Sequence, residues 1–356
     1  MKILICTGIY PPDIGGPATY SKLLKDELPK HGFDVVVLSF GEVRKFPKII
    51  RHIIYFFKVL KRGFGVAVIY AQDPVSVGLP SVLAAKILNK KFLIRVAGDF
   101  AWEQGVQRFG VGESIDDFQN KRYGFLVGFF KKVQRFVVNR SDVVITPSIY
   151  FKNLVSKWCN DPKKVITIYN GIKLVNEKRE SKKENIILTA GRLVPWKGFD
   201  ALIEIMKNLP EWRLFIIGDG PDYEKLQLLI KEGNLENRVF LKGPVSRGNL
   251  MSLLSNSKLF ILNTSFESFS FLVVEAMFAG VPVITTNIGN LNEIIENNKE
   301  GILVEPNNKE QILNAIKKIN SNNKFREEVI ANARKKSDFF SIENTINNLI
   351  GVLKNL

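Results

Sequence analysis

The chain of 356 residues contains only two cysteines and two histidines, so neither a disulfide framework nor a histidine-rich metal site organises it. Cys6 and Cys159 have no metal-ligand spacing, and free cysteines fit a reducing cytoplasm. No apolar run approaches the roughly 18 residues that a membrane-spanning helix needs. The opening MKILICTG is too short and too polar at its ends for a signal peptide. We therefore expect a cytoplasmic protein.

Motifs for dinucleotide cofactors and nucleic acids are also missing. Neither half contains G-x-G-x-x-G: Gly218 and Gly220 begin such a pattern, but Pro221 follows at once. No nucleic-acid-binding module is recognisable, and no Asp-x-Asp element stands out. These absences argue against a nicotinamide enzyme and against nucleic acid as a partner. The net charge of +16 then indicates another anionic partner, either a membrane surface or a small molecule.

Strands alternate with helices along both halves of the chain, which predicts an α/β protein with two doubly wound parallel sheets. The length also exceeds the usual size of one hydrophobic core. We expect an N-terminal Rossmann-like domain over 1–172 and a polar linker over 173–185. A C-terminal Rossmann-like domain should follow over 186–340, and a final helix over 341–356 should pack back on the first domain.

The most informative stretch is 263–292, NTSFESFSFLVVEAMFAGVPVITTNIGNLN. A Ser-rich turn separates an expected strand over 259–262 from an apolar helix, whose first N–H groups could hold a phosphate. Glu267 and Glu275 stand around this turn with seven residues between them. Glu275 lies on the second turn of the expected helix, where a carboxylate cannot serve as a cap. We interpret this stretch as half of a sugar-nucleotide site.

Three other loops should lie at the carboxyl ends of the strands, where α/β sheets bind ligands. Arg192 and Lys197 flank a tight turn and could hold a diphosphate, although both could simply be solvated. Gly15 and Gly16 precede a helix and either approach a ligand or only shape the turn. Asp99 directly follows a buried strand, so it is either a catalytic residue or a helix N-cap.

Two segments, 44–62 and 121–140, combine lysine and arginine with aromatic and aliphatic residues. Helices of this composition suit an anionic membrane surface. The alternative is that each is an ordinary Rossmann helix whose apolar side packs on the sheet while its basic side is solvated.

Spaced features along nearly the whole chain resemble family 4 of the retaining glycosyltransferases, also called glycosyl transferases group 1. The likeness is carried by Gly15–Gly16, Asn170–Gly171, GRLVPWKG at 191–198, GDGP at 218–221 and ESFSFLVVEAMFAGVPVI at 267–284. The resemblance implies the GT-B fold, two Rossmann-like domains that face each other across a cleft, with 1–172 as the acceptor-side domain and 186–340 as the nucleotide-sugar donor domain. It also implies a hexosyltransferase that moves a sugar from a nucleoside-diphosphate sugar to an acceptor hydroxyl with retained configuration. Neither a cofactor nor an obligatory metal is implied.

The resemblance also assigns roles to matching positions. Glu275 would bind the donor ribose, Glu267 the transferred sugar, and Arg192 and Lys197 the diphosphate. Further donor contacts would come from Gly15, Gly16, Asn170, Gly191, Gly218, Ser270, Phe271 and Leu272. Many members carry a sugar-contacting histidine in the first half, where this chain reads GDFAWE. Asp99 is the nearest candidate there, and it would contact the sugar or acceptor, or only shape the loop.

The expected acceptor is a lipid-linked molecule or a glycan in cell-envelope polysaccharide or glycolipid synthesis, reached at the inner face of the membrane. Two alternatives stay open. A sugar-nucleotide epimerase with the same fold would need acid and base groups in both domains, and the sequence offers no convincing pair. A non-catalytic sugar-nucleotide or polyanion binder would fit the net charge of +16, but the presence of Arg192, Lys197, Glu267 and Glu275 together argues against a loss of catalysis. The sugar, the base and the linkage are not indicated.

Overall fold

The computed structural model describes residues 1–13, 15–172 and 184–356. The chain forms two compact units. Unit 1 contains Met1–Asn170 together with Glu343–Leu356, and unit 2 contains Gly171–Ile342. The last helix of the chain therefore belongs to unit 1, where the Thr345 hydroxyl donates to the Tyr169 carbonyl at 2.8 Å.

Unit 1 is built on a sheet of six parallel strands in the order β2-β1-β3-β4-β5-β6. Short apolar runs form these strands, and the central ones are buried on both faces. The bounds are β1 Lys2–Thr7, β2 Asp34–Ser39, β3 Val68–Ala71, β4 Lys91–Arg95, β5 Val143–Thr146 and β6 Val165–Thr167.

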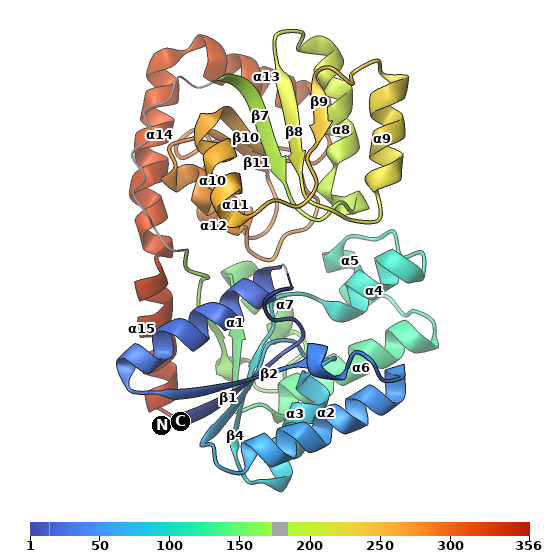
Figure 1. Cartoon of the computed structure of the whole chain (residues 1–356), viewed down its shortest axis with the longest axis vertical. Helices are drawn as coiled ribbons and strands as arrows, with labels where there is room; N and C mark the ends of the chain where they lie inside the picture. Colours follow the sequence, from blue (N-terminus) through green and yellow to red (C-terminus); the bar gives the residue numbers. More distant parts are fainter. Residues whose placement is uncertain (14, 173–183) are drawn as a thin grey trace. The chain divides into compact units, whose positions relative to one another are not determined.

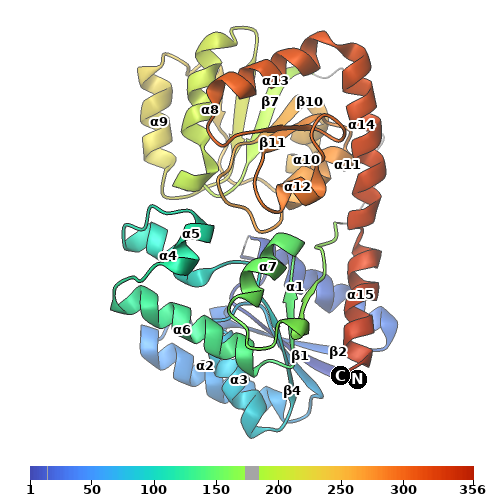
Figure 2. The same ribbon diagram turned by 180° about the vertical axis from the view of Figure 1, so that it is seen from behind.

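Helices cover both faces of this sheet. Figures 1 and 2 show α1 and α15 on one side, while α2, α3 and α6 lie side by side on the other. The main helices are α1 Gly16–Glu27, α2 Lys48–Gly63, α3 Gly78–Ile87, α4 Phe100–Arg108, α5 Ile115–Asn120, α6 Phe125–Arg140, α7 Ile149–Ser156 and α15 Ile342–Lys354.

Unit 2 repeats this architecture with six parallel strands in the order β12-β11-β10-β7-β8-β9. The strands are β7 Glu184–Ala190, β8 Arg213–Ile217, β9 Val239–Leu241, β10 Ser257–Leu262, β11 Val283–Thr286 and β12 Ile302–Val304. The helices are α8 Phe199–Ile205, α9 Tyr223–Glu232, α10 Arg247–Asn256, α11 Phe271–Phe278, α12 Leu291–Ile294, α13 Lys309–Ser321 and α14 Asn323–Ser337. Packing of α8, α9 and α13 on the sheet builds one apolar core, and α10, α11 and α14 lie on the other face.

The predicted pair of doubly wound parallel sheets is confirmed, but several local expectations differ from the structure. GDFAWE is not a loop throughout, because α4 begins at Phe100. The helix expected over 121–140 begins only at Phe125, as α6, because Lys121–Gly124 is a non-helical connection from α5, which ends at Asn120. The expected linker 173–185 lies outside the described residues, except for Glu184 and Asn185, which open β7.

Candidate functional site

The loop between β7 and α8 and the loop after β10 are tied together at the carboxyl ends of the two strands. The Ser265 N–H donates to the Trp196 carbonyl at 2.8 Å. The buried Asn263 side chain donates to the Gly198 carbonyl, also at 2.8 Å. These bonds join two segments of sequence about 70 residues apart. They place the loop that carries Lys197 beside the turn that carries Glu267, the carboxylate predicted to contact the sugar.

Lys197 and Glu267 form an ion pair at that junction. The Lys197 Nζ atom lies 2.6 Å from Glu267 Oε2, and both side chains are largely withdrawn from solvent. A partly desolvated pair is stronger than a surface pair because water screens it less. The structure thus brings together two residues that were predicted to act on adjacent parts of one ligand, the diphosphate and the sugar.

Two glycines at this carboxyl edge, Gly198 before α8 and Gly218 after β8, are required by packing. Gly198 adopts φ 54°, and a Cβ atom there would lie 2.4 Å from Asn263 Nδ2. Gly218 has φ 133°, and a Cβ atom would lie 1.9 Å from the Gly191 carbonyl oxygen. The Gly191 and Gly218 backbones therefore touch each other. This backbone contact requires a glycine at 218 whether or not a ligand binds there. Gly191 remains a candidate for a ligand contact at the carboxyl edge of the sheet.

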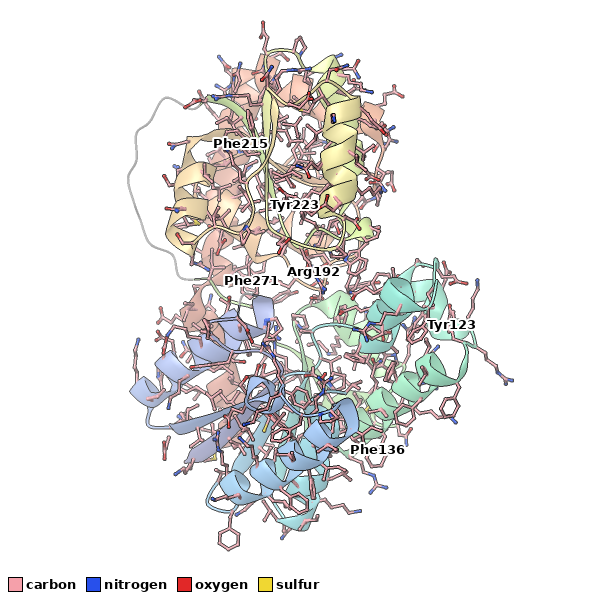
Figure 3. All side chains as sticks on the ribbon, turned by 45° about the vertical axis from the view of Figure 1, so that its right-hand side comes forward. Tyr123, Phe136, Arg192, Phe215, Tyr223 and Phe271 are labelled. Carbon is pink, nitrogen blue, oxygen red and sulfur yellow. The ribbon has the colours of Figure 1, made fainter. Side chains whose placement is uncertain are left out.

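The turn after β10 ends at Ser270, the N-cap of α11. Its hydroxyl accepts from the Val273 N–H at 3.3 Å, so the side chain caps the helix. The first helical N–H groups, those of Phe271 and Leu272, have no partner within the helix because no preceding turn offers a carbonyl. In Figure 3, Phe271 and Arg192 lie at the same end of unit 2. This helix start can accept an anion.

Glu275 lies on the second turn of α11, as predicted, and is 3% exposed. Its Oε1 atom lies 2.5 Å from Arg247 Nη2, and Arg247 is half exposed on α10. Burial raises the pKa of Glu275, and the Arg247 guanidinium offsets part of that rise. A buried carboxylate with one exposed cationic partner is well placed to exchange that partner for the hydroxyl groups of a ligand.

Arg192 differs from Lys197 because it is exposed, and no partner among the described residues holds it. Arg192 directly follows Gly191 at the carboxyl edge of the sheet, and its side chain points away from that edge. An exposed guanidinium can reorient toward an incoming anion at little cost.

The predicted residues of unit 1 lie at the carboxyl edge of its own sheet. Gly15, with φ 153°, is the N-cap of α1, and Gly16 is the first residue of that helix. Asn170 is buried after β6, where its Oδ1 atom accepts from Arg95 Nη2 at 2.7 Å. Nothing in unit 1 contradicts a donor contact by Gly15, Gly16 or Asn170.

Asp99 is the N-cap of α4 and is buried. Its Oδ1 atom accepts from the Trp102 N–H at 3.1 Å and from Gln134 Nε2 at 3.0 Å. Its Oδ2 atom accepts from Gln119 Nε2 at 2.8 Å. Burial raises the Asp99 pKa, while these donors favour the charged form. Both carboxylate oxygens are occupied by the protein, so the geometry favours the N-cap interpretation over a sugar contact.

Sequence reasoning did not single out Arg247 or Asn290. Arg247 carries no sequence signal, because its role depends on α10 packing beside α11. Asn290 lies in the loop after β11, and neither polar atom of its buried side chain has a hydrogen-bond partner among the described residues. An asparagine directly before a short helix is typical of a helix cap, so the sequence gives no indication that this side-chain amide lacks a partner among the described residues.

Neither a metal cluster nor a membrane-spanning helix is found in the described part of the chain. No group of three His, Cys, Asp or Glu side chains there could hold a metal ion. No described helix combines the length and the hydropathy that crossing a bilayer requires.

Two family models match the chain, one for each half. Residues 14–175 match the model described as Glycosyltransferase Family 4, and residues 172–336 match Glycosyl transferases group 1. The sequence is similar to that of an uncharacterized glycosyltransferase of Methanocaldococcus jannaschii, with 26% identity over 97% of this chain and 96% of the relative. It is also similar to a phosphatidylinositol N-acetylglucosaminyltransferase subunit from Arabidopsis thaliana, with 25% identity over 89% of this chain and 74% of the relative.

Solved structures share the fold. The Anabaena protein HepE, in complex with UDP and glucose, matches the whole chain over its own whole length with a TM-score of 0.82 and 20% identity. The two six-stranded parallel sheets and this match establish a two-domain α/β architecture of the GT-B type. With both of its halves matched by family models, the chain belongs to glycosyltransferase family 4.

Proposed function

We propose that this glycosyltransferase moves a sugar from a nucleoside-diphosphate sugar to an acceptor hydroxyl with retention of the anomeric configuration. The observation that carries the donor half is the junction in unit 2. There the segment after β10 carries Glu267, the start of α11 and Glu275, and Lys197 from the loop after β7 pairs with Glu267. A diphosphate, a sugar and a ribose occur together in such a donor.

The chemical problem is charge that develops as the sugar–phosphate bond breaks. The leaving diphosphate gains negative charge, which Lys197, Arg192 and the N–H groups of Phe271 and Leu272 would stabilise. Glu267 would hold a sugar hydroxyl, and its carboxylate also fixes the position of the Lys197 ammonium. Glu275 would accept hydrogen bonds from the ribose. For the sugar, we propose that the acceptor hydroxyl attacks on the face from which the diphosphate leaves, without an obligatory metal.

We propose a lipid-linked or glycan acceptor of cell-envelope polysaccharide or glycolipid synthesis, met at a membrane surface. Support comes from α2, α3 and α6, which contain ten lysines and arginines and no acidic residue. The Arabidopsis relative carries a lipid, phosphatidylinositol, in its name, which is a further support.

The exposed residues of these helices favour the membrane over a merely solvated basic face. On α2 the apolar stripe points outward: Ile49 is 77% and Phe57 is 61% exposed, whereas Tyr55 and Val59 pack inward. Phe125 at the start of α6 is 87% exposed. Apolar side chains surrounded by cations suit the interface of an anionic bilayer.

Part of the charge in segment 44–62 is neutralised inside unit 1. Lys58 and Arg62 both pair with Glu42, and Arg44 pairs with Asp13. The main support for membrane binding is therefore the exposed apolar residues and the cations of α6. The total charge of the segments is weaker support.

Incubation with UDP-, GDP- and ADP-sugars tests the donor half. Bound donor should raise the melting temperature of the wild type, because a ligand of the native state stabilises it, and should do so less in Glu275→Gln. No response to any donor would refute donor binding. Incubation of the enzyme with its donor but without an acceptor distinguishes an epimerase from a transferase. An epimerase would convert the donor sugar, whereas a transferase would leave the donor intact or hydrolyse it slowly.

Liposome flotation tests the membrane half. The wild type should float with vesicles of phosphatidylglycerol and phosphatidylcholine, and Ile53→Glu/Phe57→Glu should lose most of that binding. A Leu228→Glu substitution, on an exposed residue of α9 in unit 2, provides the control. Equal flotation of wild type and double variant, or no flotation at all, would refute the membrane surface.

A further inference from the structure

Arg95 is a buried cation for which no counter-ion is found in the described residues. It ends β4 in the middle of the unit 1 sheet and is 2% exposed. Its Nη2 atom donates to Asn170 Oδ1, and its guanidinium lies 4.1 Å from the centre of the Tyr20 ring. The Nε and Nη1 atoms, which carry three of the five N–H donors, have no hydrogen-bond partner among the described residues.

The side chains around Arg95 also lack groups that could neutralise its charge. The β3–β4 register pairs Ala71 with Ile94, so Gln72 lies beside Arg95. Gln72 is also buried, and neither of its side-chain polar atoms makes a hydrogen bond to a described residue. The hydroxyls of Tyr20 and Tyr70 lie 3.5 Å apart, and burial raises the pKa of each, so both stay neutral at physiological pH.

The acidic residues that follow the same strands are already used elsewhere. Asp73, after β3, accepts from the N–H groups of Val75 and Ser76. Asp99, after β4, accepts from three donors around α4. A buried guanidinium without a counter-ion is strongly destabilising, and buried donors almost always have partners. Because no described residue fills this role, an anion from outside the described part of the chain is the partner that fits these donors.

We propose that Arg95, with Gln72, forms an anion-binding subsite that takes a phosphate or carboxylate group of the acceptor. The cluster lies at the carboxyl edge of the central strands, where parallel sheets bind ligands. Unit 2 has its own cations, Arg192 and Lys197, for the donor diphosphate. The subsite rests on the proposed function, because it names the acceptor class of the same reaction.

Two variants test the subsite in the full-length protein. Arg95→Gln removes the cation. Asn170→Asp keeps the cation but places a carboxylate where an amide oxygen now lies 2.7 Å from Nη2. That carboxylate should neutralise Arg95 from within, so it should raise the melting temperature and exclude an external anion. Arg108→Gln is the control, because it removes an exposed arginine of unit 1.

The probe is inorganic phosphate, titrated at constant ionic strength into protein saturated with whichever of UDP, GDP or ADP it binds. The nucleotide occupies the donor phosphate site, so the remaining phosphate binding reports the subsite. We expect at least tenfold weaker phosphate binding in Arg95→Gln and Asn170→Asp and unchanged phosphate binding in Arg108→Gln. Nucleotide affinity should stay within threefold of wild type in Arg95→Gln and Arg108→Gln.

Three results would overturn the subsite. One is phosphate binding that is absent in wild type or equal in all variants. A second is weakening of nucleotide binding by Arg95→Gln, which would assign Arg95 to the donor diphosphate. The third is a crystal soaked in selenate that shows only ordered water at Nε and Nη1. Failure of every nucleotide to bind would instead refute the proposed function, so the two failures are distinguishable.

Discussion

The Arg247 guanidinium lies 2.5 Å from the Glu275 carboxylate, although the two residues belong to different helices, α10 and α11. The carboxylate is buried and the guanidinium is half exposed. In the free protein, the Arg247 guanidinium therefore offsets part of the free-energy cost of burying the Glu275 carboxylate. A ribose at Glu275 would compete with Arg247 or share the carboxylate with it.

Glu275→Gln should stabilise the free protein at neutral pH while weakening nucleotide binding. Burial raises the Glu275 pKa above its ordinary value of 4.5, so the folded state holds this proton more tightly than the unfolded state. The stabilising contribution is present below pH 4.5 and is lost as pH rises through the folded pKa. The gap in melting temperature between Glu275→Gln and wild type should therefore widen from pH 4 to pH 7.

Nucleotide affinity of Glu275→Gln should fall about 10- to 100-fold, since a hydrogen bond to a charged group is worth about 1.5–3 kcal/mol. Calorimetric titration measures this loss. Glu224→Gln, an exposed change on α9, is the control for charge alone. Unchanged affinity in Glu275→Gln would remove the ribose role.

Arg247→Ala should lower the stability of the free protein by about 1–2 kcal/mol, because it leaves the buried Glu275 carboxylate without its cation. The estimate stays below the value for a fully buried pair because Arg247 is half exposed. Bound nucleotide should recover more of this loss than it adds to wild type. Melting temperatures with and without nucleotide measure both effects, and an equal ligand-induced shift in the two proteins would contradict the exchange.

Lys197→Met should lower kcat about 10²–10³-fold, as expected when one positioned donor to a developing anion is removed. It also leaves the Glu267 carboxylate without its 2.6 Å partner, so the melting temperature should fall slightly. Arg192→Met should reduce kcat without a change in melting temperature, since Arg192 is exposed. Steady-state kinetics and thermal unfolding of both variants check this contrast.

Asp99→Ala should act mainly on stability, with a loss of about 1–3 kcal/mol from the cap and the stranded amide groups of Gln119 and Gln134. Asp99→Asn should recover part of the loss because asparagine also caps helices. Normal kinetic constants for the folded fraction of both variants would support the structural role. A large rise in acceptor KM with an unchanged melting temperature would instead support the sugar or acceptor contact.

Gly218→Ala should destabilise the protein by roughly 2 kcal/mol or more, because the new Cβ atom would overlap the Gly191 carbonyl and the backbone is strained for alanine. Denaturant unfolding measures the loss. Gly248→Ala, in the first turn of α10, has open space around the added methyl and should be nearly neutral. Equal stability of the two variants would show that Gly218 is not required for packing.

Sequence alone determined the fold class and the positions of the candidate residues Lys197, Glu267 and Glu275 relative to the strands and helices. Alternation of apolar strands and helices implies parallel sheets, since each crossover needs a helix, and parallel strands place the following loops at one edge. Lys197, Glu267 and Glu275 could be found in this way because each lies in a loop after a strand or near a helix start. The spacing of Glu267 and Glu275 around a Ser-rich turn was sufficient to locate the start of α11.

Only the tertiary structure decided which of these residues have partners and how far each is buried. Asp99 and Gly218 follow strands just as Lys197 and Glu267 do. Yet Gln119 and Gln134 donate to the Asp99 carboxylate, and the Gly191 backbone lies directly against Gly218. Arg247 acquires its role from helix packing, and Arg95 is unusual only because no carboxylate among the described residues reaches it. Local pattern fixes the position of a residue along its strand or helix. Its charge environment depends on neighbours that are far away in sequence.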